Sequence, residues 1–220
     1  MRRIVTPELL DDDLGTPSQV AASLNDLRHI NQWFGGTRTS IALLRRIARE
    51  VGANHLSLLE IGSGSGDVPL AASRVLARSS IAVDVTLLDR RLAHLPSNGS
   101  AVAADATRMP FRDNSFDVVT CSLFAHHFDP PALQNLCRES LRVARRAVVI
   151  NDLIRSRMHL LLVYLGLPLF RSPITWHDAP ASVRASYTLD EMQSLVSSVE
   201  ARRVELSRHF LFRMGAVLWK

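Results

Sequence analysis

Apolar residues follow two different patterns along the chain, and the change falls near residue 53. Before that point they repeat every three or four residues, as on one face of a helix, at Ile41, Leu44, Ile47, Ala48 and Val51. This spacing predicts helices over residues 19–34 and 38–51, and Gly52 is a typical stop signal. Residues 1–18 are polar and acidic, and we expect them to form a mobile arm.

After residue 53, short runs of Val, Ile and Leu alternate with helical patterns. The expected strands are 56–61, 81–88, 101–104, 116–121 and 147–150. Helices are expected over 68–77, 133–143 and 188–199, with a mixed helical stretch over 154–170 and a turn at His177-Asp178. Residues 201–207 and 211–218 would close the sheet as an antiparallel hairpin. Apolar strands alternating with helices indicate an α/β fold around a buried, mostly parallel sheet.

The first predicted strand runs into a glycine-rich turn with the sequence Gly62-Ser63-Gly64-Ser65-Gly66. Glycines allow a tight turn and close approach of the backbone to a ligand. The helix that follows would point free N–H groups at a carboxylate or phosphate. Asp89 ends the next strand, where an acid can accept both hydrogen bonds of a ribose diol. The pattern therefore predicts a nucleoside-containing cofactor.

Three acidic residues distinguish this motif from the one that binds dinucleotides. Asp67 stands where the pattern G-x-G-x-x-G has its last glycine. Glu60 precedes the first glycine, where it would repel a pyrophosphate but attract an ammonium group. Asp105 follows the third strand. An NAD-dependent oxidoreductase is therefore the weaker alternative.

Four sequence blocks carry a family resemblance: LEIGSGSGD, LLDRR, ADATRMPFRDNSFDVV and CSLFAHHF. With these blocks in order over about residues 55–152, the chain resembles the class I S-adenosylmethionine (SAM)-dependent methyltransferases, especially the small-molecule enzymes of quinone biosynthesis. The resemblance implies a Rossmann-like fold with a mostly parallel seven-stranded sheet and a closing antiparallel hairpin. Residues 1–52 would form an arm and helices within a substrate lid, and residues 53–220 the methyltransferase domain.

The same resemblance implies a set of SAM-binding residues. It comprises Glu60, Gly62, Ser63, Gly64, Gly66, Asp89, Arg90, Asp105, Ala106 and Cys121. Glu60 would help to hold the amino group, Asp89 the ribose hydroxyls and Asp105 the adenine amine. Cys121 would lie close to the sulfonium.

Two histidines, His126 and His127, follow the fourth predicted strand at the end of the sheet where open α/β folds bind ligands. Either could deprotonate a phenol, because histidine titrates near neutral pH. The alternative is that they pack or cap a helix. Phe124 is expected to line the substrate pocket in either case.

Asn151-Asp152 is similar to a pair found in metal-dependent catechol methyltransferases. Those sites also need an acid after the fourth strand, where this chain has Cys121-Ser122, so we expect no metal. Asp152 and His159 are instead candidate substrate-binding residues.

Residues 158–170 are apolar on nearly every helical face. Such a helix is buried, covers an apolar ligand or contacts a membrane surface. Together with the paired histidines, it favours a small, apolar, phenolic or quinol-like acceptor, and O-methylation over C-methylation.

The net charge is +5, and Lys220 is the only lysine among 26 basic residues. The arginines form no long basic run, which argues against a nucleic-acid acceptor, although an RNA or other macromolecular substrate is kept as an alternative. A SAM-binding protein without activity is a further alternative. Two cysteines without metal-binding spacing and an N-terminus without an apolar core favour the cytoplasm.

Overall fold

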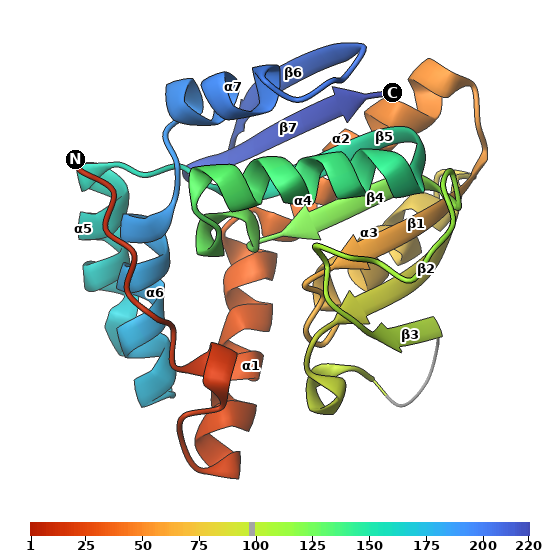
Figure 1. Cartoon of the computed structure of the whole chain (residues 1–220). Coiled ribbons are helices and arrows are strands. Elements are labelled where there is room, and N and C mark those ends of the chain that lie inside the picture. The colour runs from red at the N-terminus through yellow and green to blue at the C-terminus, as the bar shows by residue number, and fades with distance from the viewer. Residues whose placement is uncertain (97–99) are drawn as a thin grey trace.

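The computed structural model describes residues 1–96 and 100–220, and in this part of the chain a seven-stranded sheet lies between helices (Figure 1). The strand order is β3-β2-β1-β4-β5-β7-β6, and β7 runs antiparallel to β5 and β6 on its two sides, whereas the other pairs are parallel. The strands are β1 (His55–Ile61), β2 (Ala82–Asp89), β3 (Ser100–Ala103), β4 (Phe116–Ser122), β5 (Ala144–Leu153), β6 (Arg203–His209) and β7 (Arg213–Trp219). The predicted Rossmann-like fold with a closing hairpin is confirmed.

Helices cover both faces of the sheet, which is why its strands are apolar on both sides. They are α1 (Pro17–Trp33), α2 (Gly36–Val51), α3 (Asp67–Ala77), α4 (Pro130–Val143), α5 (Arg157–Gly166), α6 (Pro173–Ala185) and α7 (Leu189–Ser197). Leu58 belongs to an apolar cluster with α2 and α3, while its neighbour Leu59 belongs to a cluster with α4 and α7. Successive side chains of one strand point to opposite faces of the sheet and therefore pack into two separate apolar cores.

Helix α6 replaces the turn expected at His177-Asp178, so that expectation was wrong. Ser172 caps the helix by accepting a hydrogen bond from the N–H of Ile174, and Pro173 occupies the first turn. Pro180 lies inside the helix, where proline is unfavourable, and it hides the helical pattern in the sequence. Packing against α1 and α5 stabilises a helix that local preference does not predict.

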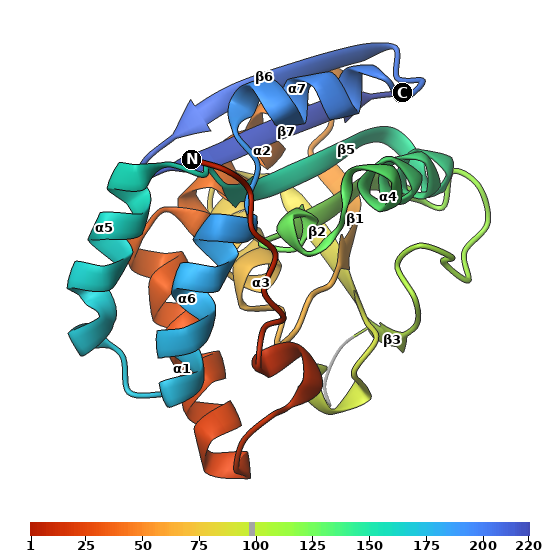
Figure 2. The ribbon, with the colours of Figure 1, turned by 60° about the vertical axis from the view of Figure 1, so that its left-hand side comes forward.

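The N-terminal arm, residues 1–16, packs along α6 instead of extending into solvent (Figure 2). The N–H of Ile4 donates to the carbonyl of Arg184, at 3.1 Å. The N–H groups of Leu9 and Leu10 donate to the Asp178 carboxylate, at 2.8 and 3.0 Å. These contacts differ from the expected mobile arm, because they hold the arm against α6. They bring the acidic residues of the arm to the carboxyl end of the sheet.

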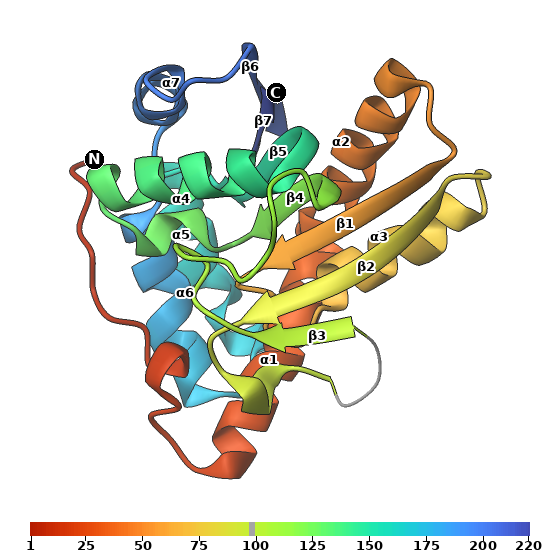
Figure 3. The same cartoon turned by 45° about the vertical axis from the view of Figure 1, so that its right-hand side comes forward.

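The carboxyl ends of β1, β2 and β4 meet at one edge of the molecule, beside α1, α6 and the arm (Figure 3). This is where an open α/β sheet binds ligands.

Candidate active site

The loop between β1 and α3 adopts a shape that requires glycine. Gly62, Gly64 and Gly66 have φ angles of 61°, 49° and 70°, in the left-handed region. A Cβ atom on Gly62 would lie 2.5 Å from the Phe124 ring, and one on Gly66 would lie 2.5 Å from Leu87. The glycines thus keep the loop close to the sheet.

Asp89 lies beside this loop and is already held by backbone N–H groups. Its Oδ2 accepts a hydrogen bond from Gly64, at 2.7 Å, and its Oδ1 accepts one from Arg91, at 2.9 Å. Both bonds fix the carboxylate at the cavity wall, where a ribose diol could donate to it.

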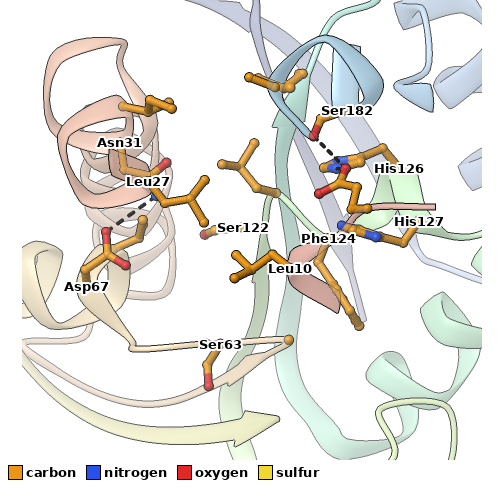
Figure 4. Close-up of a pocket in the computed structure, with 18 of the residues that line it drawn as sticks. Leu10, Leu27, Asn31, Ser63, Asp67, Ser122, Phe124, His126, His127 and Ser182 are labelled. Atoms are coloured by element: carbon orange, nitrogen blue, oxygen red, sulfur yellow. Dashed lines mark hydrogen bonds and ion pairs between the residues drawn. The ribbon is translucent and has the colours of Figure 1, made fainter. Parts of the chain in front are cut away.

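A cavity of about 820 Å³ lies between the glycine-rich loop, α1, α5, α6 and the arm (Figure 4). Residues predicted to bind SAM line one part of it: Glu60, Gly62, Ser63, Gly64, Asp89, Arg90, Asp105 and Ala106. Gly66 shapes the loop behind this wall. The hydroxyls of Ser63 and Ser122 are buried in the wall without hydrogen-bond partners among the described residues. Unpartnered polar groups beside a glycine cradle fit the amino acid part of SAM.

Cys121 does not occupy the position expected beside the sulfonium. Its side chain is 2% exposed and packs in the apolar cluster under α4, where burial raises the pKa of the thiol. Side chains alternate along β4, so Ser122 reaches the cavity instead.

Asp152 also differs from its expected place in the substrate pocket, because it lies behind His126. Its Oδ1 is 2.7 Å from His126 Nδ1, and its Oδ2 accepts a hydrogen bond from the His126 N–H, at 3.0 Å. The carboxylate is 2% exposed and therefore serves the histidine.

His126 is buried between two carboxylates. Its Nδ1 faces Asp152, and its Nε2 is 3.3 Å from the Glu8 carboxylate, which also accepts a hydrogen bond from Ser182. Burial alone would lower the pKa of His126, but the two negative charges outweigh it and raise the pKa to about 10. The ring therefore holds its proton at neutral pH, which argues against the expected role of His126 as a base.

His127 has a different environment although it is the next residue. It lines the cavity with a fifth of its side chain exposed, and its Nδ1 lies 2.9 Å from the Asp11 carboxylate. Its ring centroid is 4.4 Å from that of His126 (Figure 4). The sequence analysis did not place Glu8 or Asp11 of the arm in the site. The acidic residues gathered in the polar arm were the signal that could have pointed to them.

Glu8, His126 and His127 each place one potential ligand atom within 4.8 Å of the others. Two histidines and a carboxylate are a common zinc ligand set. Both ring nitrogens of His126 already face carboxylates, however: Nδ1 lies 2.7 Å from Asp152 and Nε2 lies 3.3 Å from Glu8. The geometry thus favours an ion-paired cluster over a metal centre.

The far side of the cavity is mostly apolar, with two buried basic groups. His159 stacks on Phe212 at 5.0 Å, and its Nδ1 lies 3.0 Å from the Ile154 carbonyl; burial lowers its pKa, which keeps it neutral. Arg213 is 1% exposed and donates to Asn31 Oδ1 at 3.3 Å, while its Nη1 has no partner among the described residues. Arg213 and Asn31 were missed, because neither belongs to a sequence motif.

Comparison with known proteins agrees with this geometry. Residues 59–150 match the family described as a methyltransferase domain. No curated protein sequence matches the chain.

Three solved structures are similar in shape. The plantazolicin methyltransferase BpumL in complex with a pentazolic desmethylPZN analog and SAH has a TM-score of 0.70 and 17% identity, covering 97% of this chain and 95% of that one. The same enzyme in complex with SAH has a TM-score of 0.71 and 16% identity, covering 97% and 94%. Human N-acetylserotonin methyltransferase with SAM has a TM-score of 0.58 and 9% identity, covering 88% and 53%.

At these identities the solved structures establish the shared fold, while the sequence match covers the strands and loops that form the cofactor side of the cavity. The NAD-dependent alternative is thereby set aside. The match over residues 59–150, together with the shared fold, supports a SAM-dependent methyltransferase that uses SAM as its methyl donor.

Proposed function

We propose that the enzyme methylates the hydroxyl oxygen of a small, apolar, phenolic or quinol-like acceptor. The cavity has a cofactor side and an apolar side, and this division carries the proposal. Beyond the cofactor side, its wall is built from apolar side chains of α1 and its C-terminal end, of α5 and of the turn before β7: Leu24, Leu27, Ile30, Phe34, Leu162, Val163, Leu211 and Phe212. A wall of this kind fits an acceptor with a large apolar area.

His127 lies at the boundary between the two sides and is the proposed base. Of the two tautomers of a neutral ring, Asp11 beside Nδ1 selects the one with its proton on that nitrogen, which leaves the lone pair on Nε2. When bound, SAM supplies an electrophilic methyl group on a positively charged sulfur. His127 Nε2 would take the hydroxyl proton as the acceptor oxygen forms its new bond to carbon.

His126 would act as a positioning residue. Its ring lies 4.4 Å from that of His127, tilted by 31°, and the ion pairs with Asp152 and Glu8 hold the His126 ring in one orientation. Phe124 packs between Gly62 and Phe128 and would align the acceptor, since alignment supplies much of the acceleration of a displacement reaction. The proposal also assigns the arm and first helices, residues 1–52, to a lid over the acceptor.

Product analysis with isotope-labelled SAM and a panel of apolar phenols tests the acceptor atom. We expect a methoxy signal in the NMR spectrum of the product. A ring-methyl signal would replace the proposal with C-methylation.

The role of His127 is tested by comparing His127→Ala with His126→Gln. His127→Ala should lower kcat by about 10²–10⁴-fold with unchanged SAM affinity. The loss should shrink as pH approaches the pKa of the phenol, because a phenolate needs no base. His126→Gln should keep the wild-type shape of the pH profile, since His126 carries its proton throughout the neutral range. A His127→Ala enzyme with wild-type kcat at neutral pH would show that alignment alone drives the reaction.

A further inference from the structure

The outer face of α5 exposes apolar side chains to solvent. Met158, Leu161, Leu162 and Leu165 lie on α5, and Leu169 lies in the short 3-10 turn that follows it. All five side chains are 41–68% exposed, and we call them the α5 patch. Helix α5 lies at the outer edge of the molecule, beyond α6 (Figure 2). Exposed apolar residues gathered on one helix indicate a binding surface.

The α5 patch is continuous with the acceptor side of the cavity. Leu162, Leu165 and Leu169 contribute to both surfaces, because they line the cavity and are also open to solvent. This helix is therefore a thin apolar wall between the cavity and the surroundings.

The charged residues of the segment that carries the patch are all of one sign. Residues 153–177 contain no aspartate or glutamate. Exposed Arg157 and Arg171 flank the patch at its two ends, and Arg184 donates a hydrogen bond to the hydroxyl of Tyr164 on the same helix, at 2.7 Å. An apolar face bordered by arginines is typical of helices that lie in the surface of an anionic membrane.

We infer that the α5 patch docks on an anionic lipid bilayer, so that an apolar acceptor enters the cavity from the lipid. This inference rests on the proposed apolar acceptor. Among the described residues, no helix has the length and apolar character needed to cross a membrane, so the contact is with the surface. A two-fold contact between copies fits less well, because it would bring arginines of both copies together without carboxylates from this segment to pair them.

Co-sedimentation with vesicles tests the surface without measuring activity. The wild-type protein should sediment with vesicles that contain phosphatidylcholine and phosphatidylglycerol. The variant Met158→Ser/Leu161→Ser should partition at least about tenfold more weakly, since it removes two side chains that would enter the lipid. Neither residue lines the cavity, so SAM affinity should be unchanged. Leu92→Ser is the matched control, because Leu92 is 72% exposed on a distant turn.

The dependence on lipid charge tests the arginines. The wild type should prefer vesicles with phosphatidylglycerol over vesicles of phosphatidylcholine alone, and it should lose that preference at high salt. The variant Arg157→Gln/Arg171→Gln should bind the two kinds of vesicle equally. The inference is wrong if wild-type protein stays in the supernatant with anionic vesicles, or if Met158→Ser/Leu161→Ser sediments like the wild type. A wild-type dimer that this variant converts to a monomer in light scattering would identify the patch as a protein interface instead. Failure of the proposed O-methylation would appear separately, in product NMR with phenols in free solution.

Discussion

At the scale of single residues, Glu60 connects cofactor binding to pH. Burial raises the pKa of its carboxyl group to about 7, although the hydroxyl of Thr120 on the neighbouring strand donates a hydrogen bond to it. Below that pH the group is neutral in the empty protein, whereas the ammonium group of SAM is stabilised by the carboxylate. Binding must therefore release a proton in acidic solution.

We accordingly predict that SAM affinity rises between about pH 5.5 and 7, by up to about tenfold per pH unit at the acidic end. Isothermal titration calorimetry in buffers of different ionisation enthalpy would measure both the affinity and the proton release. Glu60→Gln should bind more weakly at pH 7.5 and lose the pH dependence. A wild-type affinity that stays constant over this range would contradict the assignment of Glu60 to the amino group.

Asp89 gives a second prediction on the same ligand. Asp89→Ala should weaken SAM binding by about 1.5–3 kcal/mol, the scale of hydrogen bonds to a charged group. Calorimetry on the folded variant measures this, with Asp84→Ala as the control, because Asp84 lies on the same strand but pairs with exposed His55. Undiminished affinity in Asp89→Ala would remove the carboxylate from the cofactor site.

At the scale of elements, the arm is held by a side chain of α6. The Asp178 carboxylate accepts hydrogen bonds from two consecutive backbone N–H groups, those of Leu9 and Leu10. Asp178→Ala should destabilise the protein by about 1–3 kcal/mol, since it leaves these donors without an acceptor. It should also accelerate tryptic cleavage after Arg3, and thermal unfolding and mass spectrometry would measure the two effects.

The control for this variant is Asp190→Ala, an exposed acid in the first turn of α7. Because the arm supplies Glu8 and Asp11, Asp178→Ala should also lower kcat more than it lowers SAM affinity. Cleavage at the wild-type rate would mean that the arm does not depend on this contact.

At the scale of the whole molecule, the residues that resemble a metal-dependent site are already engaged elsewhere. Asn151 donates hydrogen bonds to the Gly36 carbonyl, at 2.9 Å, and to the Ser40 hydroxyl, at 2.8 Å, which joins β5 to α2. Asp152 holds His126. The pair thus connects the sheet to the helices and to the histidine cluster.

We therefore predict that activity survives EDTA and that the purified protein contains no stoichiometric metal by elemental analysis. The contacts of the pair support this, because Asn151 and Asp152 are already bound by protein groups. Loss of turnover in EDTA that Mg²⁺ or Zn²⁺ restores would contradict the prediction. If His126→Gln then lost turnover as well, the metal would be placed at the histidine cluster.

The sequence by itself determined the parallel sheet, the closing hairpin and the cofactor loop. These features have local signals: apolar runs that match strand and helix periods, and glycines at positions with positive φ. The side chain of Asp89 could be placed for the same reason, because a residue at the carboxyl end of a parallel strand has few directions available to it.

Only the tertiary structure decided how the acceptor side is built. The two neighbouring histidines are equivalent in sequence, but the short turn at Ala125–His127 turns one ring into the interior and leaves the other at the cavity. The arm that pairs with them lies more than a hundred residues away in the chain, and Pro180 hides the helix that holds this arm. Long-range packing and charge pairing fixed the states of these groups, and neither is encoded in the spacing of residues along the chain.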